Sequence, residues 1–368
     1  MVEISCGIDT IIALHFNVPR RGGSVAKPKA IDLFSGAGGL SQGLRQAGFD
    51  VVGALEIDTD ACEVFSANHP QTTLIRGDIA ETSVEDALHQ WGVKHKELDL
   101  LAGCPPCQGF STIGTRNRSV SHDDARNNLI FQMLRFVEGL LPKVVMVENV
   151  PALARDVRLA RFCQRLTDLG YSYDVKVLDV QQYNVPQRRK RMILLASRIG
   201  RITVRDVDLT WGRPKTVRSA FSNLKPDYLE QDALSGLVGH HTDHVMEIIR
   251  AIPHDGGSRR ELPDRLTLEC HKKTNGFGDV YGRMAWDMPS PTITCGCVNP
   301  SKGRFLHPEE NRAISLREAA ILQTFPLNYS FPVVKGRQKL STMIGNALPP
   351  KFIEFHARCV AALLRSSS

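Results

Sequence analysis

The sequence predicts a doubly wound α/β fold, with a mainly parallel sheet and a second, smaller and loop-rich domain. Short apolar runs alternate with stretches of helical periodicity from about residue 30 to residue 200, and this alternation is typical of βαβ units. A Gly-rich turn follows the first apolar run, at a position where open sheets of this kind bind ligands. The alternation fades after about residue 225, and residues 235–310 are rich in Gly, Pro, His, Lys and Arg.

The expected elements follow from these patterns. Strands are predicted at five apolar runs, residues 30–34, 51–55, 98–102, 144–147 and 192–196, and a further β-like stretch precedes Asp78. Helices are predicted through Leu44 and over residues 158–169, 315–323 and 352–364. Ser315 and Glu318 have the spacing of a capping box, which indicates the start of the third of these helices.

The length of 368 residues exceeds the usual size of one domain, so a large domain and a smaller one are expected. We predict a basic, flexible N-terminal extension over residues 1–29 and a first domain over residues 30–225. The second domain is expected over residues 226–315, followed by a C-terminal segment over 316–368 that returns to the first domain.

Composition restricts the class of protein without fixing its partner. The net charge of +7 is a modest bias towards polyanions, and many proteins with this balance bind no nucleic acid. Nine scattered cysteines are an odd number in a long chain, which favours a reducing cytoplasm over a disulfide scaffold. No stretch approaches the ~20 apolar residues of a membrane span, and polar residues interrupt the N-terminal apolar run. We therefore expect a soluble, intracellular protein that does not bind a membrane.

The Gly-rich turn lies within residues 32–40, between a predicted strand and a helix. Its backbone N–H groups can approach a ligand closely, and the helix N-terminus favours a carboxylate or phosphate. Glu56 ends the next strand, where an acid would bind ribose hydroxyls, and Asp78 would reach an adenine amino group. The turn lacks the Gly-x-Gly-x-x-Gly pattern, so it indicates either a nucleoside cofactor or a structural turn.

A second group of residues, 103–111, follows the predicted strand 98–102. Cys104 and Cys107 have Cys-x-x-Cys spacing, which also occurs in redox pairs and zinc sites. No second pair matches it, because Cys295-x-Cys297 and Cys270-His271 fit poorly, so no metal is expected. Two prolines stiffen the approach to Cys107, which favours a positioned nucleophile.

Two further groups carry charged side chains. Glu148 directly follows the strand 144–147, where a buried carboxylate would tend to a raised pKa and could hold or deliver a proton. A capped turn is the alternative for this position. The basic run 186–191 leads into another strand, and alternation would point Arg189 and Arg191 to one side. The alternative for this run is a solvated face.

Taken in this order, the groups resemble the DNA (cytosine-5) methyltransferase family, over the chain from about Ile31 to its C-terminus. The segments that carry the resemblance are residues 32–40, Pro105-Pro106-Cys107-Gln108, Glu148-Asn149-Val150, residues 187–191, Arg317-Glu318-Ala319-Ala320 and residues 345–350. The resemblance implies a class I S-adenosylmethionine-dependent methyltransferase fold. It also implies methylation of C5 of a specific cytosine in double-stranded DNA, after the base is flipped out of the helix.

The resemblance assigns a role to each site residue. Cys107 would add to C6 of the cytosine, Glu148 would contact N3 and Arg191 would reach O2. Arg189 would hold the phosphate beside the flipped nucleotide. The S-adenosylmethionine site would be formed by Phe34, Gly36, Gly38, Glu56, Ile57, Asp78, Ile79, Pro106, Leu129 and Asn346.

DNA contacts are expected from two regions. Residues 111–126 resemble a mobile basic lid over the catalytic pocket, with a plain surface loop as the alternative. Residues 226–315 would be the target-recognition domain, which also carries Arg265, Lys272 and Lys273, and the segment 292–294 would anchor it near the flipped base. The predicted DNA-binding residues are Gln108, Ser111, Arg116, Arg118, Arg259, Arg260 and Thr292.

The family suggests a monomeric bacterial modification enzyme in the cytoplasm, with or without a restriction endonuclease that acts separately. A tRNA cytosine-5 methyltransferase is one alternative, but such enzymes usually continue with Pro-Phe-Thr, whereas Gly109-Phe110-Ser111 follows here. A non-catalytic DNA-binding regulator is the other. The presence of Cys107, Glu148 and Arg191 argues against it.

Overall fold

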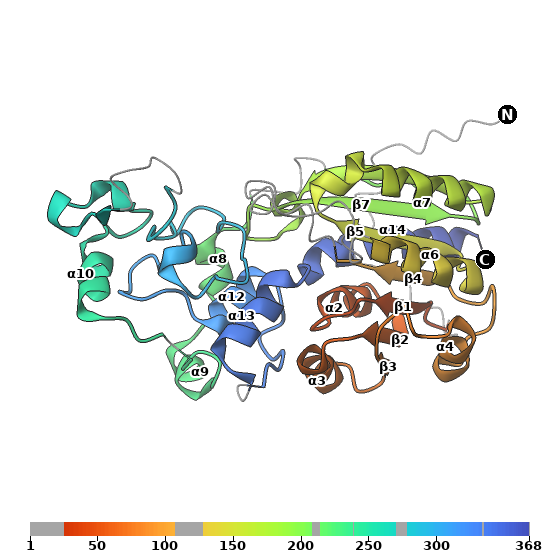
Figure 1. The fold of residues 1–368 in the computed structure, drawn as a ribbon, viewed down its shortest axis with the longest axis horizontal. Helices are drawn as coiled ribbons and strands as arrows, with labels where there is room; N and C mark the ends of the chain where they lie inside the picture. Colours follow the sequence, from red (N-terminus) through yellow and green to blue (C-terminus); the bar gives the residue numbers. More distant parts are fainter. Residues whose placement is uncertain are drawn as a thin grey trace, which may run out of the picture.

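A seven-stranded sheet with helices on both faces forms one side of the molecule (Figure 1). The computed structural model describes residues 26–106, 128–207, 214–237, 239–269, 278–332 and 335–367. The strands lie in the order β3-β2-β1-β4-β5-β7-β6, and β7 alone runs antiparallel to its neighbours. Their bounds are β1 Lys29–Leu33, β2 Asp50–Glu56, β3 Thr73–Arg76, β4 Leu100–Gly103, β5 Val144–Asn149, β6 Ser172–Asp179 and β7 Lys190–Ser197. The predicted doubly wound α/β fold is confirmed.

Alternating side chains of the strands enter two apolar cores. Along β5, for example, Val145 and Val147 face one core while Val144 and Met146 face the other. The first core is covered by α4 (Val84–Trp91), α6 (Leu129–Leu140) and α7 (Val157–Asp168), and the second by α2 (Gly39–Gln46) and α14 (Pro350–Ser366). The helix α3 (Thr59–Asn68) connects β2 and β3, and short 3-10 helices η3 (Pro151–Arg155) and η4 (Val180–Tyr183) lie near the sheet.

The described residues from 214 to the end of α13 form a second lobe, which has no sheet in its described part (Figure 1), whereas Ile202 and Val204, just after β7, pack in the second core of the first lobe. The helices of the second lobe are α8 (Val217–Phe221), α9 (Pro226–Gln231), α10 (Asp243–Ala251), α12 (Leu316–Leu322) and α13 (Arg337–Asn346), with 3-10 turns η6 (Arg259–Glu261), η7 (Asp264–Leu266) and η8 (Pro300–Lys302). The helices α8, α12 and α13 share one apolar core, which also includes Ala37 and Val64 from the first lobe. This core therefore joins the two lobes. The domain boundaries remain a prediction.

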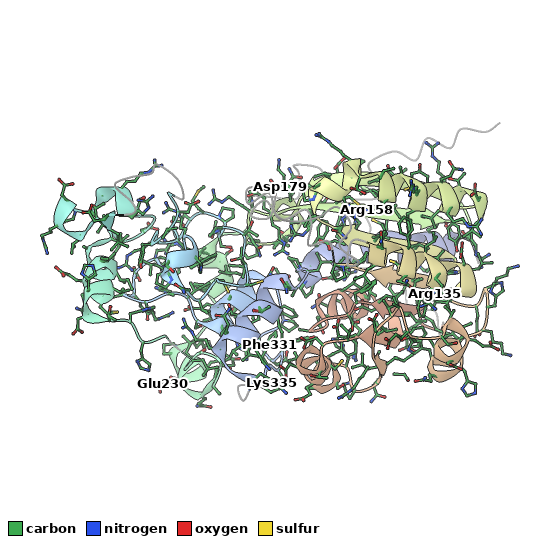
Figure 2. The ribbon with its side chains drawn as sticks, in the orientation of Figure 1. Arg135, Arg158, Asp179, Glu230, Phe331 and Lys335 are labelled. Carbon is green, nitrogen blue, oxygen red and sulfur yellow. The ribbon has the colours of Figure 1, made fainter. Side chains whose placement is uncertain are left out.

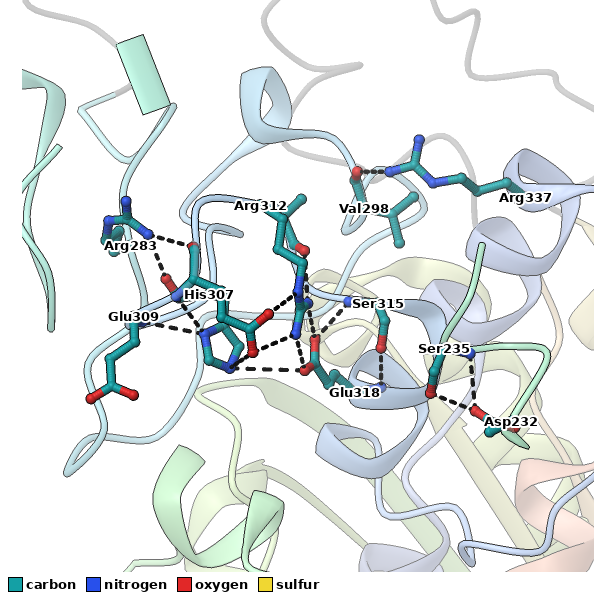
Figure 3. A network of polar contacts seen from close by, with 12 residues as sticks. Asp232, Ser235, Arg283, Val298, His307, Glu309, Arg312, Ser315, Glu318 and Arg337 are labelled. Carbon is teal, nitrogen blue, oxygen red and sulfur yellow. Dashed lines mark hydrogen bonds and ion pairs between the residues drawn. The ribbon is translucent and has the colours of Figure 1, made fainter. Parts of the chain in front are cut away.

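Hydrogen bonds from buried and half-buried arginine side chains hold the loops of the second lobe together. The guanidinium of Arg283 is fully buried and donates to the carbonyls of Ile249 and Ile252 at the end of α10, at 2.9 and 3.0 Å. Nearby, Arg312 binds both carboxylate oxygens of Glu318 at 2.8 Å (Figure 3). Arginine has five donors and therefore satisfies several loop carbonyls or a carboxylate at once.

The capping box predicted at the start of α12 is confirmed. The backbone N–H of Glu318 donates to Ser315 Oγ at 3.1 Å, and the backbone N–H of Ser315 donates to Glu318 Oε2 at 2.7 Å. Two N–H groups at this helix end are thereby satisfied.

No helix in the described ranges is both long and apolar enough to cross a membrane.

His356, on α14, gives stability a pH dependence. Its ring packs against Tyr183, Phe352 and Phe355, and neither ring nitrogen has a hydrogen-bond partner among the described residues. Burial lowers the pKa of His356 to about 3. The folded state thus favours the neutral ring, and the stability this provides is lost as pH falls from the unfolded-state pKa of about 6.5 towards 3.

We expect His356→Leu to remove this pH dependence. Between pH 7 and pH 5 the wild type should lose about 2 kcal/mol of unfolding free energy through His356, and the variant should not. Urea unfolding followed by circular dichroism at both pH values measures the difference. The exposed His89 provides the control, because His89→Gln should retain the wild-type loss. Equal pH dependence in wild type and His356→Leu would contradict the prediction.

Candidate active site at the carboxyl edge of the sheet

The parallel strands bring the predicted site residues to one edge of the sheet. Phe34 follows β1, Glu56 ends β2, Cys104 follows β4 and Glu148 lies near the end of β5. Because β7 runs antiparallel to β5, Arg191 at its start comes to the same edge, with Ile193 as the register partner of Glu148. The sheet thus brings together residues that are more than 150 positions apart in the sequence.

The Gly-rich turn is held in an unusual backbone conformation. Phe34, Gly36 and Gly38 all have positive φ, of 61°, 52° and 89°. A positive φ is strained for phenylalanine, and such strain is concentrated at functional sites. The carboxylate of Glu56 stabilises the turn, because Glu56 Oε2 accepts from the Gly36 N–H at 2.8 Å and Oε1 accepts from Ile57 N–H at 2.9 Å. These three residues with positive φ are among those predicted to bind the cofactor.

The structure also describes the other predicted cofactor residues. Phe34 and Leu129 both border the first apolar core, and Ile79 is buried in it. The side chain of Ile57 is 63% exposed, which is unusual for isoleucine and leaves an apolar face available for a ligand. The remaining members are Asp78, which follows β3, Pro106, which is exposed after β4, and Asn346, which is exposed at the end of α13.

Glu148 and Arg191 form the polar centre of the site. Glu148 is only 6% exposed, and its Oε1 lies 2.8 Å from Arg191 Nε in an ion pair. Sequence analysis placed both residues at the site but did not predict that they pair. A carboxylate fixed by a guanidinium can orient a ring nitrogen and its neighbouring carbonyl at the same time.

Cys104 is unsuited to be a nucleophile. Burial raises the pKa of its thiol well above the usual range, and the negative charges of Glu148 and Asp32 raise it further. A thiol is nucleophilic only when it ionises, so Cys104 stays inert. Cys107, the predicted nucleophile, lies outside the described residues, as do Gln108, Ser111, Arg116, Arg118 and the whole predicted lid.

Asn149 is a site residue that sequence analysis did not single out. Its Nδ2 donates to the Pro105 carbonyl at 2.8 Å, and its Oδ1 accepts from the Val150 N–H at 2.8 Å. The side chain therefore holds the chain two residues before Cys107. Its position in Glu148-Asn149-Val150 was the signal that could have identified it.

Arg189 has a different environment from the one expected for a phosphate ligand. It is 6% exposed, and its Nη1 donates to the carbonyls of Ile293 at 3.2 Å and Gly345 at 3.4 Å. Burial, and then the positive charge of Arg191, lowers the pKa of Arg189 to about 9. Arg189 thus links β7 to the second lobe, and its phosphate contact remains a prediction. The predicted alternation is confirmed, because Arg188 and Lys190 are exposed.

The segment 290–293, which overlaps the predicted anchor 292–294, lies beside residues 186–188, just before β7; its place near a flipped base remains a prediction. Thr292 Oγ1 donates to the Arg188 carbonyl at 2.6 Å, and the Arg188 N–H donates to the Ser290 carbonyl at 2.9 Å. The fully buried Gln187 accepts from the Ile293 N–H at 3.1 Å. Gln187 is therefore a structural residue, like Asn149, and sequence analysis did not identify it because it lies in a run of basic residues.

The arginines of the second lobe that are predicted to contact DNA differ in their exposure to solvent. Arg259 and Arg260 are neighbours in η6, but Arg259 is 7% exposed whereas Arg260 is exposed. Exposure favours Arg260 as the residue that reaches a phosphate. Within the described ranges, no group of three or more His, Cys, Asp or Glu side chains is arranged to hold a metal.

Comparison with known proteins gives a consistent result. The family model of the C-5 cytosine-specific DNA methylase matches residues 28–361. The chain is 36% identical over 333 residues to the Type II methylase M.HgiDII of Herpetosiphon aurantiacus, covering 87% of this chain and 91% of that protein. It is 31% identical over 342 residues to the Type II methyltransferase M1.HphI of Haemophilus parahaemolyticus, covering 90% and 86%.

Solved structures show the same fold at lower identity. A DNA modification methyltransferase encoded within an Escherichia coli prophage superimposes with a TM-score of 0.70 and 24% identity, covering 92% of this chain and 100% of that one. The S. pombe Dnmt2 methyltransferase gives a TM-score of 0.61 and 20% identity, covering 93% and 99%. The similarity extends over both lobes of the chain.

Proposed function

Because the chain belongs to the C-5 cytosine-specific DNA methylase family, we propose that it methylates a cytosine flipped out of double-stranded DNA through a covalent bond between Cys107 and C6. The observation that carries the proposal is the buried Glu148–Arg191 ion pair at 2.8 Å, beside the strained Gly-rich turn. Family and fold imply S-adenosylmethionine as the methyl donor.

The residues around the Gly-rich turn fit this cofactor. Glu56 Oε2 accepts from the Gly36 N–H alone and keeps a lone pair that can accept from a ribose hydroxyl, whereas Oε1 already accepts from the N–H groups of Ile57 and Asp58. The exposed face of Ile57 suits the adenine ring, with Phe34 on the same side of the sheet edge. When bound, S-adenosylmethionine supplies an electrophilic methyl group. Asp78 and Asn346 would bind its polar ends.

We expect Glu56→Ala to weaken S-adenosylmethionine binding by at least about tenfold. Each lost charge-assisted hydrogen bond is worth ~1.5–3 kcal/mol, and the Gly36 N–H also loses its acceptor. Calorimetry with the cofactor measures the effect, while affinity for duplex DNA should stay within about twofold. The matched control is Glu85→Ala, at an exposed position on α4. Unchanged cofactor affinity in Glu56→Ala would contradict the role of this carboxylate.

Side chains of the protein would activate the cytosine for methyl transfer. C5 of cytosine is a weak nucleophile, and addition of the Cys107 thiolate to C6 makes it enamine-like. Glu148, in its protonated form, would give its proton to N3 and Arg191 would donate to O2, so that the negative charge entering the ring is stabilised at both atoms. After C5 is methylated, loss of its proton and departure of the thiolate restore the aromatic ring. A cysteine is suited to this cycle because its thiolate is both a good nucleophile and a workable leaving group.

Transfer of tritium from labelled S-adenosylmethionine to duplex DNA and to tRNA tests the proposal directly. We expect label in acid-stable 5-methylcytosine of DNA and none in tRNA. Label in tRNA alone would favour the tRNA enzyme, and no transfer to either would favour a non-catalytic regulator. Mapping methylated cytosines in the DNA of an expressing host would then identify the sequence that is read.

The similarity to these relatives also suggests how the target is recognised and in which biological system the enzyme acts. We propose that residues 226–315 recognise the target sequence, with Arg260 and Thr292 near the DNA. The Type II names of the relatives suggest a bacterial modification enzyme. We propose in addition that it acts in the cytoplasm as a monomer. A restriction endonuclease of the same specificity would act separately.

A further inference from the structure

The segment 325–331 lies at the junction of the two lobes, where Figure 2 labels Phe331 and Lys335. Tyr329 is 3% exposed and packs against the rings of Phe325 and Phe331, with centroids 4.7 and 5.3 Å away. Its carbonyl accepts from Arg317 Nη1 at 3.0 Å, and Arg317 in turn pairs with Asp232 at 2.9 Å. The second lobe therefore fixes the backbone of Tyr329.

The first lobe binds the same segment from the other side. Asn68, at the end of α3, donates to the Ser330 carbonyl and accepts from the Ser330 N–H, both at 2.8 Å. Lys335 forms ion pairs with Asp60 at 2.8 Å and Glu63 at 2.6 Å, both on α3. Tyr329 thus stands at a position that both lobes determine.

From this position Tyr329 reaches the Gly-rich turn. Its hydroxyl donates to the Ala37 carbonyl at 2.6 Å and lies 3.0 Å from His69 Nε2. The other ring nitrogen of His69 lies 3.3 Å from Arg45 Nη1. Because arginine can only donate, Nδ1 must accept and the proton must reside on Nε2. Hydrogen bonds therefore run in one direction, from Arg45 through His69 and Tyr329 to the turn.

The buried ring of His69 keeps this arrangement fixed. Burial and the neighbouring charge of Arg45 lower the pKa of His69 to about 4, so the ring is neutral near pH 7. A Cβ at Gly38 would lie 2.5 Å from Tyr329 Oη and 2.6 Å from His69 Nε2. The turn therefore rests directly on this pair, and only glycine allows so close an approach at φ 89°.

We propose that Tyr329 and His69 are positioning residues, which hold the Gly-rich turn from the second lobe in the shape that binds the cofactor. Glu56 holds the turn at Gly36 N–H and Tyr329 holds it one residue later at the Ala37 carbonyl. Without the Tyr329 hydroxyl, the Ala37 carbonyl loses its donor and the His69 N–H loses an acceptor, and both losses favour other shapes of the turn. The inference rests on the proposed use of S-adenosylmethionine.

The test compares two tyrosines whose hydroxyls bind different carbonyls. Tyr329→Phe keeps the ring packing and removes the contact with Ala37. Tyr228→Phe is the matched control, because the Tyr228 hydroxyl donates to Leu327 in the same segment at 2.8 Å but does not touch the turn. We expect Tyr329→Phe to raise the calorimetric Kd for S-adenosylmethionine about tenfold. Tyr228→Phe should change it less than about twofold, and kcat at saturating cofactor should be unchanged in both.

A second pair of variants tests whether Tyr329 and His69 act together. It also provides the test if Tyr329→Phe does not fold. His69→Leu removes both hydrogen bonds and should raise Kd as Tyr329→Phe does, whereas His69→Gln can donate and accept and should partly restore binding. The double variant Tyr329→Phe/His69→Leu should be no weaker than the single variants, since the two residues act through one contact.

Three results would overturn the inference: an unchanged Kd in Tyr329→Phe, an equal rise in Tyr228→Phe, or full additivity in the double variant. Failure of the wild type to bind S-adenosylmethionine would instead refute the proposed function.

Discussion

Cys107→Ser is expected to abolish covalent trapping of DNA that carries 5-fluorocytosine at the target, while Cys104→Ala retains it. If the Cys107 thiolate adds to C6, the enzyme must later remove the substituent at C5. Fluorine cannot leave as a cation, so the methylated adduct should persist. Serine ionises far less than cysteine and is a weaker nucleophile, so no adduct should form although DNA binding continues.

The structure gives the reason for expecting opposite results at two cysteines three positions apart. Burial and the charges of Glu148 and Asp32 keep the Cys104 thiol protonated. Beyond it, Asn149 holds the chain at the Pro105 carbonyl, two residues before Cys107.

The experiment incubates each variant with cofactor and fluorinated duplex and looks for a denaturation-resistant complex. Peptide mass spectrometry should locate the modification at Cys107 in the wild type. Trapping that survives in Cys107→Ser, or that disappears only in Cys104→Ala, would show that the nucleophile has been assigned to the wrong cysteine.

Glu148→Gln is expected to lower kcat by about 10²–10⁴-fold, the usual contribution of a group that manages a proton in the transition state. Glutamine has nearly the same shape as glutamate and can keep its oxygen near Arg191, but it cannot give up or hold the proton that a carboxyl group can. The negative charge that develops on the cytosine ring after Cys107 attack could then not be neutralised by a proton at N3. Affinities for DNA and cofactor should change little, because the effect arises in the transition state.

Single-turnover methylation measures this effect without interference from product release. The matched control is Glu138→Gln, since Glu138 also pairs with an arginine, Arg165 at 2.6 Å, but at an exposed site. That variant should retain wild-type activity. If both glutamine variants lose activity to the same extent, loss of an ion pair rather than chemistry at N3 would be the cause.

The sequence predicted the fold well where burial dominates. The five predicted strands are buried on both faces and therefore read as continuous apolar runs. In contrast, β6 was not predicted, because it is an edge strand and most of its residues are partly or fully exposed. The capping box of α12 and the alternation of Arg189 and Arg191 followed from local spacing alone.

The site was predicted less completely, because part of it depends on contacts between distant backbone groups. Gln187, Asn149 and Tyr329 act through carbonyls or N–H groups of other segments, and the Tyr329–Ala37 contact spans 292 positions. Hydrophobic periodicity in the sequence does not identify residues that bind the backbone of a distant segment. The Glu148–Arg191 pair was missed for a related reason, since it requires the antiparallel register of β7 against β5.

The way in which Arg283 supports the second lobe also affects how specificity can change. Arg283 binds backbone carbonyls of Ile249, Ile252, His307 and Glu310, so four of its contacts are independent of the side chains at those positions. Loops held in this way can exchange their outward-facing residues without losing their support. If residues 226–315 recognise the target as proposed, substitution in these loops alone would allow new DNA sequences to be read, while the catalytic edge of the sheet stays the same.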